Sequence, residues 1–184
     1  MEYQILLIIT IILALAVIGM VVYLLTQGVF YSVKPKIEES GGYAITNQRF
    51  LGDPKEILPT LEKQVEILKK HQIGYAHPIC IYDDIPASTA KDINAQIGFV
   101  LYKGTKENLI DLSKELSLAT FEKKERIVVS FPFRGKLSLQ LGIMKAYPAM
   151  IKFANKQNFT VGQVTEIYNG IERRVEYLMD FERN

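Results

Sequence analysis

The chain has 184 residues, with 22 basic and 20 acidic side chains and a formal net charge of +2. The charges nearly balance along the chain, which excludes a typical nucleic-acid-binding protein, and we expect no nucleic-acid partner. A single cysteine excludes a disulfide scaffold.

The first feature along the chain is an unbroken apolar run over residues 5–25, with no charged residue between Glu2 and Lys34. About 20 apolar residues suffice for a helix to cross the hydrocarbon core of a bilayer. A cleaved signal sequence begins with basic residues, has a shorter apolar core and ends at a small-x-small site, and this run has none of these marks. We therefore predict a retained transmembrane anchor within residues 1–27.

The flanks of this run predict the side of the membrane on which the rest of the chain lies. Lys34 and Lys36 follow the run, whereas its N-terminal side has no basic side chain. Basic residues are retained on the cytoplasmic side, and the lone Cys80 agrees with a reducing compartment. We predict a single-pass membrane protein whose soluble domain faces the cytoplasm, with a juxtamembrane linker over residues 28–42.

Residues 43–184 are expected to form one domain, in which the order strand–helix–strand–strand occurs twice. The units cover residues 43–102 and 126–181, and the connector between them contains a helix near residues 107–116. The expected strands are residues 43–50, 78–83, 95–102, 126–133, 163–168 and 174–181. The helices are expected to bury Ile57, Leu61, Val65 and Leu68 in the first unit, and Leu137, Leu141, Met144, Tyr147, Ile151 and Ala154 in the second. Such units joined in one sheet predict an α+β sandwich, with helices on one face and a concave opposite face.

The repeat also matches residues 80–83 of the first unit to residues 166–169 of the second. Because side chains alternate along a strand, Cys80 and Tyr82 share one face, as do Glu166 and Tyr168. We expect the intervening Ile81 and its counterpart to pack against the helices. The tyrosines and the glutamate are then expected on the concave face.

Several motifs in this domain follow the spacing of a known family. They are Phe131-Pro132-Phe133, Leu137-Ser138, Tyr147-Pro148-Ala149-Met150, Glu166-Ile167-Tyr168 and Tyr82-Asp83-Asp84. In these motifs and its two units, the chain resembles the GyrI-like ligand-binding domain of multidrug-responsive transcription regulators. It is most similar to the single-pass, testis-expressed GyrI-like proteins of animals, which are ER-phagy receptors. The receptor role is not carried over, because their autophagy motif lies in a long acidic tail and this sequence stops at Asn184.

The residue most in need of an explanation is Glu166, since a carboxylate among apolar strand residues is costly unless it is satisfied. One interpretation is an ion pair with Arg174 on the neighbouring strand. The other is a groove that binds a small, partly apolar or cationic ligand, or a protein partner, through charge and aromatic walls. The pattern alone does not choose between them, and the resemblance favours the groove. The expected ligand-binding residues are Glu166, Tyr168, Tyr82, Tyr177 and Phe133.

An alternative function is hydrolysis of reactive electrophilic small molecules, because some GyrI-like proteins use a groove glutamate in this way. Glu166 is then the base, and Tyr168 or Tyr82 the hydrogen-bond donor. The absence of tryptophan and of a second acid or base group favours binding over catalysis. His71 and His77 have no clustered ligands around them, so we expect no metal. Without a glycine-rich phosphate loop we also expect no cofactor.

Overall fold

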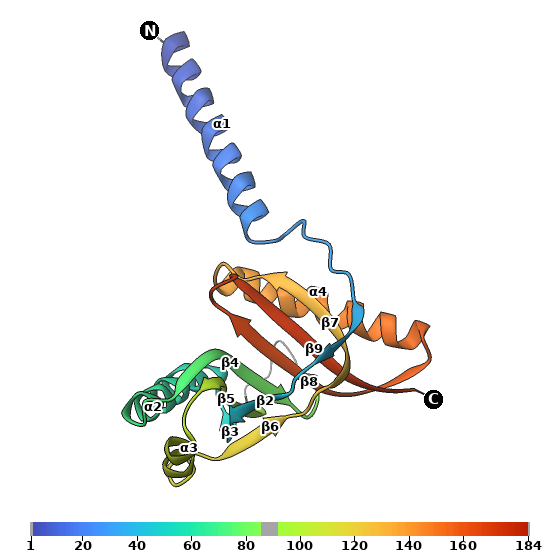
Figure 1. Ribbon diagram of the computed structural model, residues 1–184. Coiled ribbons are helices and arrows are strands. Elements are labelled where there is room, and N and C mark those ends of the chain that lie inside the picture. Colours follow the sequence, from blue (N-terminus) through green and yellow to red (C-terminus); the bar gives the residue numbers. More distant parts are fainter. Residues whose placement is uncertain (1, 86–91, 184) are drawn as a thin grey trace.

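The computed structural model describes residues 2–85 and 92–183 (Figure 1). Helix α1 (Glu2–Thr26) projects from the rest of the chain with its apolar side chains exposed. Over Tyr3–Thr26 it is long and apolar enough to span a membrane. The remaining elements form a mixed α+β domain, in agreement with the predicted class.

The domain is built on a curled antiparallel sheet. Among the described residues, the strands lie in the order β1-β7-β9-β8-β4-β5-β2-β6, and β3 also pairs with β5. The curl gives a half-barrel, in which the short strands β2 and β6 turn over the inner face (Figure 1). The strands are β1 (Lys36–Ser40), β2 (Tyr43–Thr46), β3 (Gln48–Gly52), β4 (Gly74–Tyr82), β5 (Ile93–Lys103), β6 (Leu118–Phe121), β7 (Lys124–Pro132), β8 (Phe159–Asn169) and β9 (Arg174–Arg183).

Two strand–helix–strand–strand units share this sheet. In the first, α2 (Ile57–Lys70) lies between β3 and the hairpin β4-β5. In the second, α4 (Lys136–Lys156) lies between β7 and the hairpin β8-β9. β4 and β8 pair at the centre, with Cys80 directly opposite Glu166. The two segments that the repeat matches therefore lie side by side.

Helix α2 begins and packs as its sequence predicts. The Asp53 carboxylate accepts a hydrogen bond from the backbone N–H of Lys55 at 2.9 Å and caps a 3-10 turn, Pro54–Glu56, that leads into the helix. Leu61 and Leu68 are buried. The 3.6-residue period therefore identifies the correct face of this helix.

Helix α4 packs through smaller residues than the sequence suggests. Its contact face includes Ser138, Gly142 and Ala146, which are buried, followed by Tyr147. Met144, expected to be buried, is 65% exposed, so that prediction is wrong. A Cβ at Gly142 would lie 2.4 Å from the Tyr177 hydroxyl oxygen, because the helix backbone runs close to the sheet. Small residues permit this approach, and a count of large apolar residues does not identify them.

The two faces of the sheet are reversed relative to the prediction. Ile79, Ile81 and Ile167 fill the concave interior of the half-barrel. Cys80 and Tyr82 pack in the other cluster, which includes the buried residues of both helices. The alternation of side chains along β4 and β8 correctly predicts which residues share a face. It does not predict which of the two faces packs against the helices. The curl decides this, because it closes the inner face with strand residues alone.

The linker and the connector hold more structure than expected. Residues 36–40, predicted as linker, form the edge strand β1 on β7. There Arg126 donates to the carbonyl oxygen of Ser40 at 2.6 Å and pairs with Asp180 at 2.7 Å. The predicted strand over residues 43–50 is divided at Asn47, whose backbone N–H donates to the Ser117 carbonyl oxygen. The connector contains α3 (Lys106–Leu112), shorter than predicted, and the unpredicted β6.

Candidate functional site

The site centres on Glu166, which lies on β8 at the middle of the sheet beneath α4. Its side chain is 1% exposed. Tyr147 on α4 donates its hydroxyl to Oε1 at 2.7 Å. Tyr168, two residues along β8, donates to Oε2, and Tyr82 on β4 donates to the same oxygen at 3.4 Å. Three tyrosine hydroxyls from three elements therefore surround one carboxylate.

No basic side chain within the described residues pairs with this carboxylate. Arg174, the partner considered from the sequence, instead bonds Glu172 and Glu176 at 2.7 and 2.8 Å, so that alternative is wrong. Burial raises the pKa of the Glu166 carboxyl, and the hydrogen bonds from Tyr168, Tyr147 and Tyr82 only partly oppose this rise. The site is therefore a buried acid whose ionised form is not balanced by a described cation.

The tyrosines around Glu166 are hydrogen-bond donors and not bases. Burial, followed by the nearby carboxylate, raises the pKa of Tyr147, Tyr82 and Tyr168. Burial and Glu166 likewise raise the pKa of the Cys80 thiol on β4. Because these groups keep their protons, Cys80 is not an activated nucleophile. In the described ranges, no group of three or more histidine, cysteine or acidic residues is arranged to hold a metal ion.

Two further aromatic residues predicted for the site also lie close to it. Tyr177 is opposite Glu166 on β9, and its ring meets that of Tyr147 edge-on at 5.5 Å between centroids. Its buried hydroxyl has no hydrogen-bond partner among the described residues. Phe133 meets Tyr168 edge-on at 6.1 Å, and both are half-buried. They form the outer edge of the site, whereas Tyr177 forms its floor.

The sequence pattern places Tyr147 on a packing face and does not indicate its polar role. The signal was present, since a tyrosine on the buried face of a helix needs a partner for its hydroxyl. Tyr147 also begins one of the motifs that carry the family resemblance. The Glu166 carboxylate and the Tyr147 hydroxyl are both expected to be buried and without a partner, which favours a hydrogen bond between them.

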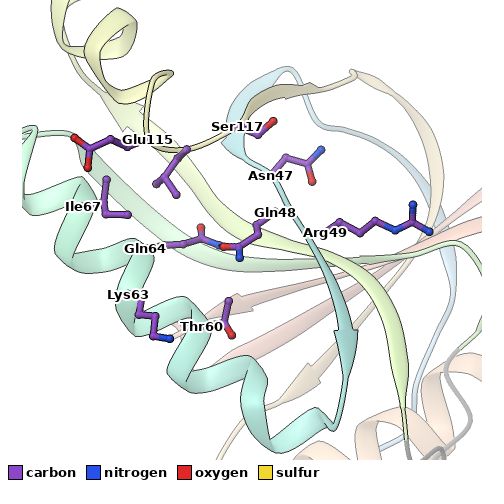
Figure 2. Close-up of a pocket in the computed structure, with 10 residues that line it drawn as sticks. Asn47, Gln48, Arg49, Thr60, Lys63, Gln64, Ile67, Glu115 and Ser117 are labelled. Atoms are coloured by element: carbon purple, nitrogen blue, oxygen red, sulfur yellow. The ribbon is translucent and has the colours of Figure 1, made fainter.

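A separate polar cavity of about 570 Å³ lies between α2, β3 and the segment after α3 (Figure 2). Its floor is the amide pair of Gln64 and Gln48, joined by a hydrogen bond of 3.1 Å. Lys63 and Arg49 point in different directions at its rim. Glu115 already forms ion pairs with the end of α2. The lining charges therefore do not converge on one point, unlike the hydroxyls around Glu166.

No protein-family model matches the chain, and no curated protein matches its sequence. Solved structures do match. The C-terminal domain of EcmrR aligns with a TM-score of 0.63 at 11% identity, over 83% of this chain and 99% of that domain. SAV2435 bound to tetraphenylphosphonium aligns at 0.54 and 11% identity, over 81% of this chain and 94% of that one. A hydrolase encoded by lin2189 from Listeria innocua aligns at 0.55 and 11% identity, over 87% and 98%.

These neighbours have GyrI-like folds, and identities this low establish a common fold alone. The particular likeness to the animal membrane receptors is not supported by the comparisons. EcmrR also matches in a complex with DNA, at a TM-score of 0.61, so the absence of a nucleic-acid partner stays a prediction. The chain therefore shares the GyrI-like fold, with a buried glutamate and its tyrosines at the centre of the sheet.

Proposed function

We propose that this protein is a membrane-anchored binding module whose site around Glu166 takes a small, partly aromatic cation. The observation that carries the proposal is the buried carboxylate, held by three hydroxyls without a described basic partner. Burying an uncompensated charge is costly, so the site favours either a proton or a cation. A ligand with positive charge and flat apolar groups satisfies the carboxylate and the surrounding rings together.

The half-buried edge of the site gives the entry route in this proposal. Tyr168 and Phe133 are the members of the site that retain exposed surface. A cation that displaces the Tyr168 hydroxyl from Oε2 can reach the carboxylate, while Tyr147 still holds Oε1. The structure of SAV2435 with tetraphenylphosphonium supports this ligand class, since that molecule is a lipophilic aromatic cation bound to the same fold.

Anchoring is the second part of the proposal. α1 crosses the bilayer, and the domain lies on the cytoplasmic side because Lys34 and Lys36 follow the helix. A protease added outside sealed right-side-out vesicles is expected to leave the domain intact. Digestion of the domain without detergent would contradict the orientation.

The ligand class is tested by titrating the full chain, in detergent micelles, with tetraphenylphosphonium and with neutral triphenylphosphine oxide. The cation is expected to bind and the neutral molecule to bind at least about tenfold more weakly. Glu166→Gln preserves shape and removes charge, so it is expected to weaken cation binding by about tenfold to a hundredfold. Glu176→Gln is the matched control, because Glu176 neighbours Ile167 across β8-β9 and bonds Arg174 instead. Equal affinities of wild type and Glu166→Gln would refute the site.

Hydrolysis of reactive electrophiles is the second candidate function, and the raised pKa of Glu166 favours it. A carboxylate with a raised pKa is a better general base, taking a proton from an attacking water while Tyr168 or Tyr82 donates to the leaving oxygen. The Listeria neighbour described as a hydrolase has the same fold. Turnover of an epoxide by the full chain, lost in Glu166→Gln and retained in Glu176→Gln, would establish this function in place of simple binding.

A further inference from the structure

The end of α1 is fixed to the domain and does not lead into a free linker. Lys145, on the outer side of α4, donates from Nζ to the carbonyl oxygens of Gly28, Val29 and Tyr31, at 3.2 Å for Gly28 and 3.1 Å for Tyr31. These carbonyls follow the C-terminal end of α1, where a cation is favourable. Gly28 has a φ of +85°, which reverses the chain at this point.

Aromatic packing completes this junction. The ring of Phe131 on β7 lies against Gly28, where a Cβ would come within 2.9 Å of it. Tyr31 meets the same ring edge-on, at 5.3 Å between centroids. The backbone just after α1 is therefore packed on α4 and β7, and α1 determines which part of the domain is nearest the bilayer.

Exposed apolar side chains lie on this nearest part of the domain. Phe30 is 70% exposed directly after α1, and Met144 on α4 adjoins Lys145 in sequence. Ile171, in the turn between β8 and β9, is 89% exposed. That turn is joined to the end of β7, since the Phe133 N–H donates to the Arg173 carbonyl oxygen at 2.8 Å. Figure 1 shows the turn on the side of the domain from which α1 leaves.

The same part of the domain is basic. Three basic side chains are exposed: Arg134 before α4, Lys136 at the first position of α4, and Arg173 in the β8-β9 turn. None of the three forms an ion pair with a described residue. The acidic residue of the turn, Glu172, is neutralised by Arg174 at 2.7 Å. Unpaired basic groups close to a bilayer are attracted to anionic headgroups.

We propose that these residues form a membrane-contact surface, which lies on the anionic headgroups of the same bilayer that α1 crosses. The surface consists of Phe30, Arg134, Lys136, Met144, Ile171 and Arg173. Its apolar side chains enter the interface, and its basic groups bind lipid phosphates and carboxylates. The proposal rests on the membrane anchoring proposed above and adds that the domain is held against the leaflet, with the β8-β9 turn in contact with it.

Site-specific fluorescence on the full chain in nanodiscs tests this surface. One fluorophore is attached at Ile171→Cys, one at Leu13→Cys within α1, and one at Ile110→Cys on α3, which is 61% exposed and distant from α1 in Figure 1. The native Cys80 is buried and does not compete for the label. Nitroxide-labelled lipids quench a fluorophore that touches the bilayer, in discs of phosphatidylcholine alone or mixed with phosphatidylserine.

We expect strong quenching at position 13 in both discs. At position 171 we expect about twofold or more quenching over position 110 in the serine-lipid discs, falling at high salt. Arg134→Gln with Arg173→Gln should lower the quenching at 171 and leave that at 13 unchanged. Quenching at 13 together with equal values at 171 and 110 would overturn the membrane-contact surface and leave the anchor intact. Absence of quenching at 13 would overturn both.

Discussion

The proposed function depends on one group, the carboxylate of Glu166. Tyrosine hydroxyls donate its hydrogen bonds, which stabilise the negative charge without neutralising it. Burial raises its pKa, so the unfolded chain ionises this group at a lower pH than the folded chain does. The protonation of one side chain is therefore linked both to folding and to the binding of a cation.

A stability measurement on the ligand-free protein tests this linkage. Because the folded pKa is raised, the contribution of Glu166 to stability is fully present below the unfolded value near 4.5 and is lost as pH rises through the folded value. Thermal melts of the full chain should therefore show a decline over that window. Glu166→Gln stays neutral; its amide oxygen accepts from the tyrosines on one side and its NH2 group donates to a hydroxyl on the other. It should lose this decline and match or exceed wild type at neutral pH, by on the order of 1–3 kcal/mol.

Glu176→Gln is the control for this experiment, since it alters a partly buried ion pair outside the site. A large loss of melting temperature in Glu166→Gln, without any ligand present, would show that the carboxylate supports the fold. The site would then have to be abandoned as a ligand site.

At the scale of single residues, the sequence predicts most of the side chains that the structure brings together around Glu166. Glu166 with its strand neighbours follows from alternation, the repeat and the cost of burying a charge. Tyr147 does not follow from alternation or the repeat, because it lies on a helix whose rotation over the sheet is set by packing. The only signal for it is the need of a buried hydroxyl for a partner. Arg174 is a reasonable partner by spacing, but it lies three positions before Tyr177, the residue opposite Glu166 on β9, and pairs with Glu172 and Glu176 on the other face.

Among the elements, α4 packs on the sheet with the smallest separation at Gly142. Gly142 allows the helix backbone to approach Tyr177, whose hydroxyl is buried beneath it without a described partner. Because the α4 backbone lies this close to the sheet, the Tyr147 hydroxyl is within hydrogen-bond distance of Glu166. The packing of one helix therefore controls the geometry of the site.

A double-mutant cycle tests this packing. Gly142→Ala places a methyl group 2.4 Å from the Tyr177 hydroxyl oxygen and should destabilise the domain by about 1–3 kcal/mol, despite the better helix propensity of alanine. Tyr177→Phe removes an unsatisfied hydroxyl and should be neutral or slightly stabilising. In the double mutant, much of the Gly142→Ala cost should disappear, which chemical denaturation of the four proteins measures. Additive effects would contradict the close approach.

Elements with strong periodicity were predicted well, and those set by distant pairing were not. Both strand–helix–strand–strand units follow from local apolar patterns. β1 and β6 are short, and each is defined by its partner strand, β7 or β2, so their own sequences give little signal. The face that meets the helices is likewise a property of the curl of the whole sheet.

For the whole molecule, the structure places an exposed apolar helix on one side of a GyrI-like domain. The helix end is packed on α4 and β7 through Lys145 and Phe131. Phe131 also lies against Gly142, which Tyr177 contacts from the sheet in the core below the site. The end of α1 and the proposed ligand site are thus joined by one packed layer, which local patterns in the sequence do not indicate.

The pH dependence of cation binding is the most direct measurement of the central claim that an ionised, buried Glu166 receives a cation. The affinity of the full chain for tetraphenylphosphonium is measured by calorimetry across the window in which the carboxyl titrates. Since the cation and the proton compete for one carboxylate, affinity should rise with pH by up to about tenfold per pH unit and then level off. Glu166→Gln should bind weakly at every pH, and Glu176→Gln should follow wild type. An affinity independent of pH in wild type, or retained in Glu166→Gln, would contradict the account.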